Sequence, residues 1–299
     1  MPERDVHFMD RSEILDFEEI ERFVRVAAGL GITKIRLTGG EPLVRRDLPE
    51  LVRRLVRIPG IRDLALTTNG VLLADQAASL YVAGLRRINV HLDTLDRDRF
   101  MEITRRDELR RVLEGLEAAR RAGYRIKLNA VAVKGLTEPD TVPLALYARE
   151  NGFEVRYIEF MPLDAQNLWD RSRVLMADEI IQALEAAISP LLAVPDPDPR
   201  APATEYDYAD GKGRVGFIAS VSRPFCMNCN RIRLTADGKL RYCLFAIEED
   251  DVKGLLRSGA HDSEIAARIS ANVARKWEGH EINSSRFTPP PRPMYSIGG

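Results

Sequence analysis

The chain has 299 residues, enough for one large domain or two ordinary ones. Its hydrophobic fraction of 45% and charged fraction of 30% are typical of a soluble protein with a large core. The net charge of -1, the absence of a membrane-length apolar run and the lack of a signal-peptide pattern lead us to expect a cytoplasmic protein that binds neither nucleic acid nor membrane.

The first 160 residues alternate helix and strand patterns. A helix is expected to begin near Ser12 and to end at Gly31, and Asp47 is a plausible N-cap for the next helix. Further helices are predicted at 48–57, 72–83, 99–104, 107–122 and 139–151, and strands at 32–37, 61–67, 86–92, 124–133 and 153–160. This alternation predicts a parallel sheet with helices outside it, and ligands at the carboxyl ends of its strands.

The remainder, residues 164–299, is less regular, and we therefore place a domain boundary between 163 and 164. A proline-rich connector is expected at 195–202, and Asp237-Gly238 is a strong hairpin signal. The tail from Thr288 holds four prolines and two terminal glycines, so no regular structure is expected there. The predicted elements are helices at 177–187, 250–258 and 262–277, a strand at 215–221, and hairpin arms at 232–234 and 239–243.

All three cysteines lie in one short stretch, as Cys226, Cys229 and Cys243. Clustered cysteines in a chain of this kind favour metal binding over disulfides. Three thiolates suit a [4Fe–4S] cluster with one iron left open, and a structural zinc with His261 or His280 as fourth ligand is the main alternative. Three buried thiols without a metal are the third interpretation.

Basic residues recur on the predicted strands and between the cysteines. Lys34 and Arg36 alternate along one strand and so share a face. A single strand cation is more often part of an ion pair, with Glu159 or Asp93 for instance, than a binding residue. Lys127 and Arg156 on later strands would, together with Arg231 and Arg233, suit a triphosphate.

Several segments of the chain resemble the GTP 3′,8-cyclases, a family of radical S-adenosylmethionine enzymes in molybdenum-cofactor biosynthesis. The GGEP turn is typical of radical enzymes in general, whereas Cys-x2-Cys-x13-Cys with an internal Arg-Ile-Arg and a terminal Gly-Gly are specific to the cyclases. The resembling segments are IRLTGGEPLVRRDL (35–48), LTTNG (66–70), INVHLDTLD (88–96), IKLNAV (126–131), RYIEFMPL (156–163), PFCMNCNRIRLTADGKLRYCLF (224–245) and IGG (297–299).

The resemblance implies an α/β fold, an incomplete (βα)6 TIM-like barrel whose open side is closed by a C-terminal α+β part. It implies GTP as substrate, 3′,8-cyclo-7,8-dihydro-GTP as product, S-adenosylmethionine as cosubstrate and two [4Fe–4S] clusters in a full-length enzyme. It further implies a downstream cyclic pyranopterin monophosphate synthase and a capacity for homodimers.

Site residues follow from the resemblance by position. The C-terminal cluster would be held by Cys226, Cys229 and Cys243. GTP would be bound by Arg36, Thr67, Lys127, Arg231, Ile232 and Arg233, with Lys34 and Arg156 assisting at the phosphates. S-adenosylmethionine would contact Gly40, Met161 and His91, the last of which stands where the family has Ser. Gly298 and Gly299 match a tail that assists catalysis.

The family's other cluster uses Cys-x3-Cys-x2-Cys, and these 299 residues hold no cysteine before Cys226. Met1-Pro2 resembles the residues that follow that motif, so the first barrel strand is expected to be missing. Two hypotheses account for this: a start assigned too late, or a non-catalytic GTP-binding protein with a single cluster. As written, the chain is expected not to cleave S-adenosylmethionine.

Overall fold

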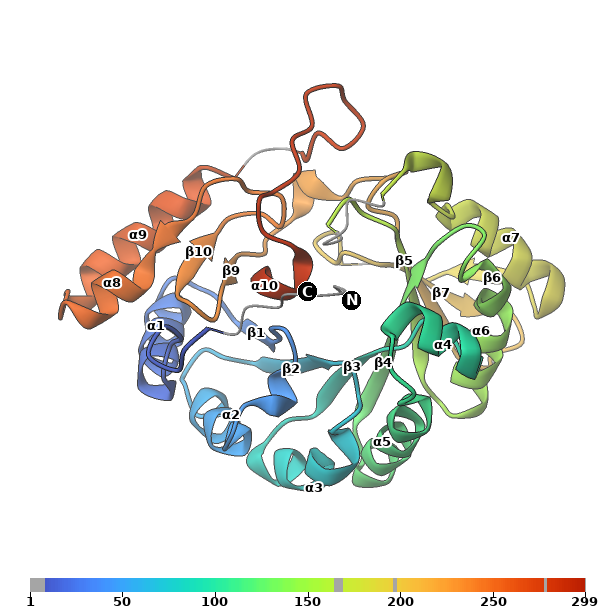
Figure 1. Ribbon diagram of the computed structural model, residues 1–299, viewed down its shortest axis with the longest axis horizontal. Helices are drawn as coiled ribbons and strands as arrows, with labels where there is room; N and C mark the ends of the chain where they lie inside the picture. The colour runs from blue at the N-terminus through green and yellow to red at the C-terminus, as the bar shows by residue number, and fades with distance from the viewer. Residues whose placement is uncertain (1–8, 164–168, 196–197, 277–278, 299) are drawn as a thin grey trace.

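The structure, a computed structural model, describes residues 9–163, 169–195, 198–276 and 279–298. Its main sheet has the strand order β1-β2-β3-β4-β5-β8-β7-β6 and curves into an open arc (Figure 1). The first six strands in that order are parallel neighbours, and the last two pairings are antiparallel. The strands are β1 (Lys34–Leu37), β2 (Asp63–Thr68), β3 (Arg87–His91), β4 (Arg125–Ala132), β5 (Glu154–Glu159), β6 (Leu191–Ala193), β7 (Thr204–Tyr208) and β8 (Arg214–Ile218).

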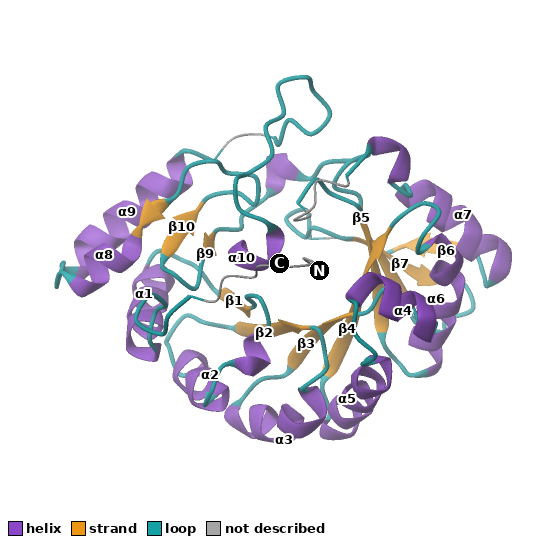
Figure 2. Ribbon diagram, in the orientation of Figure 1, coloured by secondary structure: helices purple, strands orange, loops and turns teal. Residues whose placement is uncertain are grey.

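Helices cover the outer face of this arc, as Figure 2 shows. These helices are α1 (Phe17–Gly29), α2 (Leu48–Val56), α3 (Leu73–Ala83), α4 (Arg97–Thr104), α5 (Leu109–Ala122), α6 (Thr141–Glu150) and α7 (Ala177–Ala187). A connection between parallel strands needs a crossover, and α2 to α6 supply the crossovers between β1 and β5.

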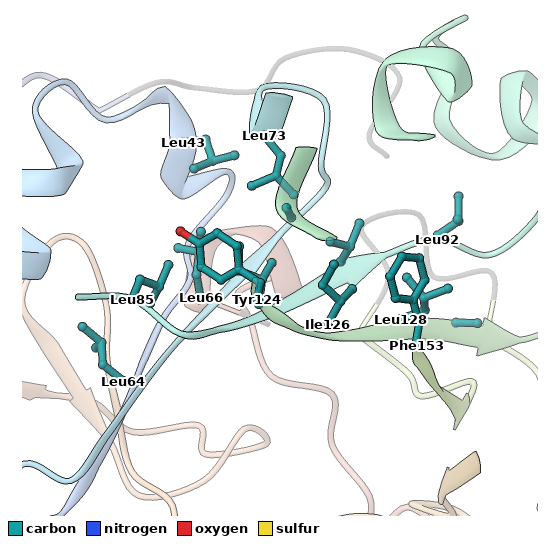
Figure 3. Packing of buried hydrophobic residues seen from close by; sticks show 14 of the residues in the cluster. Leu43, Leu64, Leu66, Leu73, Leu85, Leu92, Tyr124, Ile126, Leu128 and Phe153 are labelled. Carbon is teal, nitrogen blue, oxygen red and sulfur yellow. The ribbon is translucent and has the colours of Figure 1, made fainter. Parts of the chain in front are cut away.

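The core lies between the sheet and these helices. Strand residues such as Leu66, Ile88 and Leu128 are fully buried, together with Leu73 and Leu116 from α3 and α5. Figure 3 shows Leu66, Ile126 and Leu128 among the strand side chains of this core. The sheet is therefore fixed by apolar contact on its helical face, which leaves the other face free to line a cavity.

A smaller sheet, β11-β10-β9, lies across the arc from β5 (Figure 1). It contains β9 (Arg233–Leu234), β10 (Lys239–Arg241) and β11 (Asp250–Asp251), backed by α8 (Val252–Arg257) and α9 (Asp262–Ala274). A one-turn helix, α10 (Met294–Ile297), lies inside the arc. The molecule is thus an incomplete TIM-like α/β barrel with a C-terminal α+β part on its open side.

The five N-terminal strands and the seven helices up to α7 are confirmed, with shifted ends. Helix α1 begins later than expected, because Asp16 rather than Ser12 caps it through the backbone N–H of Glu19. Asp47 occupies the N-cap position of α2, but its side chain makes no capping hydrogen bond there. The strand expected at 215–221, the hairpin and the last two long helices are also present.

Two strands that the sequence did not predict, β6 and β7, flank the proline-rich segment 195–202 along the chain and extend the main sheet through β8. The expectation for the tail was wrong. The tail forms the helical turn α10, because Pro293 and the contacts described below fix its backbone. Among the helices of the described residues, none has the length and apolarity needed to cross a membrane.

Candidate functional site

A cavity of ≈ 2070 Å³ opens on the inner face of the arc. It is lined by β1, the turn that follows it, β9 and the tail, with further side chains from β2 to β5. The lining includes many of the site residues predicted from the sequence, namely Lys34, Arg36, Gly40, Lys127, Arg156, Arg231, Ile232, Arg233 and Gly298. The fold thus brings residues from distant parts of the chain to one place.

Arg36 and Arg233 form the most unusual electrostatic feature of this cavity. Burial, followed by repulsion from Arg156 and Arg231, lowers the pKa of Arg36 to about 10. Burial, followed by repulsion from Arg231 and Arg36, lowers the pKa of Arg233 to about 10 as well. Crowded cations without an acidic partner repel one another, so this group of arginines is suited to an anion from outside the protein.

Three cations on strands β4, β5 and β8 already have acidic partners. Lys127 Nζ lies 2.7 Å from Glu154 and 3.2 Å from Glu205. Arg156 also contacts both carboxylates, at 2.7 and 2.6 Å. Arg214 Nη1 lies 3.3 Å from Glu205 and its Nε lies 2.8 Å from Asp207. The cavity therefore has an uncompensated basic side and a nearly neutral one.

A glycine makes the second network possible. Arg156 on β5, Gly216 on β8 and Glu205 on β7 are direct partners across three adjacent strands. A Cβ at Gly216 would lie 3.2 Å from Arg156 Cγ, so a side chain there would press on the arginine. Sequence reasoning missed Glu205 and Arg214, since nothing local places β7 and β8 beside β5. Lys34, in contrast, is exposed and pairs with Asp198 at 3.7 Å.

The buried carboxylate Glu159 at the end of β5 is not an ion-pair partner in the described residues. Its oxygens accept the backbone N–H groups of Ala177, Val221 and Ser222 at 2.7–3.0 Å. It is 2% exposed, and these hydrogen bonds offset the cost of its burial. Glu159 thereby fixes the segment that leads to the first cysteine.

The three cysteines flank the basic side of the cavity as free thiols. Cys226 begins a short 3-10 turn, Cys229 follows that turn, and Cys243 comes after β10. The Nε of Arg231 donates to Cys229 Sγ at 3.4 Å, and the backbone N–H of Phe245 lies 3.5 Å from Cys243 Sγ. Burial tends to raise the pKa of Cys229, but Arg231 outweighs it and brings the pKa below the usual value.

The cysteine loop offers three thiol donors. No three His, Cys, Asp or Glu side chains within the described ranges converge on one metal position. Hydrogen bonds to two of the sulfurs match the way proteins stabilise cluster thiolates. The zinc alternative gains no support, although the His280 ring packs on Phe245 nearby.

The turn after β1 is built around Glu41. Its carboxylate accepts the Thr68 hydroxyl at 2.7 Å and the backbone N–H groups of Asn69 and Leu43 at 2.7 and 3.0 Å. Glu41 therefore ties the Gly39-Gly40 turn to the end of β2. Gly40 lies beside the tail: a Cβ added at Gly40 would be 3.8 Å from the carbonyl oxygen of Tyr295.

Three residues that were predicted to bind GTP or S-adenosylmethionine, His91, Thr67 and Met161, are not among the residues that line the cavity. His91 is exposed and pairs with Asp93 at 2.9 Å. Thr67 accepts a hydrogen bond from Asn89 at 3.2 Å. Met161 packs against a second apolar cluster that includes Leu163. These assignments stay predictions.

The C-terminal tail enters the cavity beside the turn that follows β1. Arg233 donates to the Gly298 carbonyl oxygen, and the Gly298 N–H donates to Met294 at 3.1 Å. Gly298 has φ +79°, and a Cβ there would lie 3.0 Å from Thr38 Cγ2. Only glycine suits this position. Gly299 lies outside the described residues.

Two family profiles match the chain in succession. The Radical SAM superfamily profile matches residues 3–148, and the Molybdenum Cofactor Synthesis C profile matches residues 153–282. Together with the open barrel and the cysteine loop, these matches define a protein of the radical S-adenosylmethionine class.

Curated relatives narrow the class. A GTP 3′,8-cyclase of Rhodopirellula baltica is 47% identical over 307 residues, which cover 100% of this chain and 84% of that protein. Those of Pelotomaculum thermopropionicum (47%, covering 94% of this chain and 87% of that protein) and Thermodesulfovibrio yellowstonii (44%, covering 100% and 92%) are similarly close. The chain belongs to the GTP 3′,8-cyclase family.

Solved structures resemble the chain more distantly. The crystal structure of methylornithine synthase (PylB) is 19% identical, with a TM-score of 0.47 over 57% of this chain and 52% of that one. The barrel assignment therefore rests on the strand order itself.

Proposed function

We propose that this chain serves the GTP 3′,8-cyclase reaction, the conversion of GTP to 3′,8-cyclo-7,8-dihydro-GTP in molybdenum-cofactor biosynthesis, and that the radical-forming step needs cysteines that these 299 residues do not contain. The observation that carries the proposal is the pair of cavity-lining arginines without an acidic partner among the described residues, Arg36 and Arg233, in a cavity flanked by three free cysteines. A nucleoside triphosphate supplies the negative charge that these arginines lack. The relatives named GTP 3′,8-cyclase support the same substrate.

The roles of the residues follow from the geometry of the cavity. Arg36, Arg231 and Arg233 would bind the triphosphate. Lys127 and Arg156 would assist from the neutral side, where their carboxylate partners hold them in position. Gly298 would face the bound nucleotide, because the tail lies in the same cavity. Gly40 would contact S-adenosylmethionine, as would His91 and Met161. The resemblance also assigns Thr67, Ile232 and Lys34 to GTP binding and Gly299 to the catalytic tail.

Cys226, Cys229 and Cys243 would hold a [4Fe–4S] cluster that offers an open iron to the guanine base. The side chains of this protein would orient the guanine base toward the cysteine loop and bind the phosphates among the arginines. A cluster that activates S-adenosylmethionine needs three further thiolates, and the 299 residues contain only these three cysteines. The alternative, a non-catalytic GTP-binding protein, is not favoured, since the relatives match across the whole chain.

The first test is anaerobic reconstitution of the 299-residue chain with iron and sulfide. We expect about four irons per chain, a [4Fe–4S] spectrum, micromolar GTP binding by calorimetry, and a spectral change when GTP binds. Cys229→Ala should lose the cluster. Met227→Ala is the matched control, because Met227 lies in the same turn and is 71% exposed.

The outcomes separate the parts of the proposal. Retained iron in the Cys229→Ala variant would overturn the ligand assignment, and an intact cluster without GTP binding would overturn the substrate. The 299-residue chain should form no 5′-deoxyadenosine; formation of that product would show that our cluster count is wrong.

Further parts of the proposal concern context. We propose a cytoplasmic location, a downstream cyclic pyranopterin monophosphate synthase that consumes the product, and a capacity for homodimers. We also keep the division of the chain into residues 1–163 and 164–299. Gel filtration and limited proteolysis test the last two statements.

A further inference from the structure

Arg292, in the C-terminal tail, makes an unusually dense set of contacts. Its Nη2 and Nη1 lie 3.0 and 3.2 Å from the two carboxylate oxygens of Asp237, a two-pronged arrangement. Nη1 also lies 3.1 Å from Glu249, and Nη2 donates to the Ser296 carbonyl oxygen at 2.9 Å. The Arg292, Asp237 and Glu249 side chains are each less than 20% exposed. Paired, half-buried contacts of this kind are much stronger than surface ion pairs.

The partners of Arg292 belong to the hairpin that lies beside the cavity. Asp237 sits in the turn between β9 and β10. Glu249 in turn pairs with Arg241, whose side chain is completely buried at the end of β10. Arg241 also stands directly opposite Arg233 in the β9–β10 ladder. The tail is therefore joined to the hairpin that carries both Arg233 and the approach to Cys243.

Two anchors then bracket the last turn of the tail. Arg292 fixes its beginning through Asp237 and Ser296, and Arg233 fixes its end through the Gly298 carbonyl oxygen. Without the first anchor, α10 would be held by the hydrogen bond from Arg233, by the hydrogen bond from the Met294 N–H to the Leu163 carbonyl oxygen at 3.2 Å, and by the buried side chain of Ile297. A four-residue helix is too short to be stable alone, so each of these contacts matters. Arg292 itself is not part of the cavity lining.

We propose that Arg292 is a clamp that seats the C-terminal tail in the cavity by joining it to the β9–β10 turn, and that it is thereby a positioning residue for Gly298. The role of the tail in the cavity rests on the proposed function, but the effect of Arg292 on the position of the tail can be measured without GTP. Neither Arg292 nor Asp237 would touch the nucleotide.

The test is hydrogen–deuterium exchange on the full chain, followed at the tail amides of Ser296 and Gly298. Arg292→Met keeps the length of the side chain and removes its charge. We expect tail exchange at least tenfold faster in this variant, equivalent to about 1.4 kcal/mol, with unchanged protection in β1 to β5. Arg292→Lys should lie between, because a lysine cannot bridge both carboxylates and the carbonyl oxygen.

The matched control is Arg286→Met, in the same C-terminal segment. Arg286 is 79% exposed and pairs with Glu281, so its removal should leave tail exchange unchanged. Asp237→Asn should reproduce the Arg292→Met result from the hairpin side. GTP affinity in Arg292→Met should stay within threefold of the parent chain.

Unchanged tail protection in Arg292→Met, or an unprotected tail in the parent chain, would overturn the clamp. Faster exchange throughout the protein would also overturn it, because it would indicate a general structural role. Absent GTP binding in every variant, with the tail effect intact, would instead count against the proposed function alone.

Discussion

The guanidinium of Arg233 donates a hydrogen bond to the carbonyl oxygen of Gly298, so strand β9 and the tail meet inside the cavity. Arg233 is also one of the cavity-lining cations that lack an acidic partner among the described residues. A backbone carbonyl oxygen is uncharged and accepts only one of the five N–H groups of the guanidinium, so it does not neutralise the arginine. The contact therefore leaves Arg233 able to bind a phosphate at the same time as the tail.

Gly298→Ala should displace the tail. The added Cβ meets Thr38 at 3.0 Å, and φ +79° is strained for alanine. We expect tail amides to exchange about tenfold faster, equivalent to about 1.4 kcal/mol. The matched control is Gly259→Ala, where φ is +77° but nothing lies within 4 Å. Gly259→Ala should lower the unfolding free energy by about 1 kcal/mol and leave the tail in place. An undisturbed tail in Gly298→Ala would contradict the close contact with Thr38.

Arg36→Met should separate stability from binding. Removal of a cation that Arg156 and Arg231 repel should leave the free energy of unfolding unchanged or slightly raised, measured in denaturant without ligand. The same change should weaken GTP binding about 10- to 100-fold, because a charged hydrogen bond contributes roughly 1.5–3 kcal/mol. Arg87→Met is the contrast, since Arg87 pairs with Asp63 and its loss should be destabilising. Equal GTP affinity in Arg36→Met and the parent chain would remove Arg36 from the site.

Glu205→Gln should tighten GTP binding. The carboxylate of Glu205 neutralises Lys127, Arg156 and Arg214 in the ligand-free protein. Its replacement leaves one more positive charge beside the cavity, worth about 1 kcal/mol or fivefold in affinity. Calorimetry at two salt concentrations measures both the affinity and its salt dependence. Glu248→Gln, at a 74% exposed side chain, is the control. Weaker binding in Glu205→Gln would mean that the carboxylate mainly positions the cations.

The His91–Asp93 pair should make stability depend on pH. Asp93 raises the pKa of His91 above its usual value of 6.5, against the opposing effect of burial. The pair therefore contributes fully below pH 6.5, and this contribution disappears as the pH rises through the raised pKa. We expect a loss of about 0.5 kcal/mol between pH 6 and pH 8.5, as is usual for a partly exposed pair. His91→Gln should remove this component of the difference, and an unchanged pH profile in that variant would refute the assignment.

Much of the barrel could be predicted from local patterns. The strands β1 to β5 and the helices between them have clear apolar periodicity and glycine stops such as Gly84 and Gly123. Strand β6 was missed because it is only three residues long, and β7 because Thr204, Glu205 and Asp207 make it polar. Their place depends on β8, whose pairing with β5 joins segments about sixty residues apart.

The site was predicted only in part, because some of its residues have a local signal in the sequence and others do not. The cysteine spacing and the arginines between them are visible in the sequence, and the structure places the arginines in the cavity. Glu205 and Arg292 were not anticipated, because their partners lie far away along the chain and a charged side chain carries no local signal of its partner. The tail looked irregular since four prolines prevent long helices, yet tertiary anchors stabilise one turn.

Glu159 makes the cysteine loop depend on the main sheet. Its carboxylate occupies the end of β5 and holds the backbone of Val221 and Ser222, just before the first cysteine. A displacement of β5 would therefore shift the thiols as well, although no cysteine belongs to that strand.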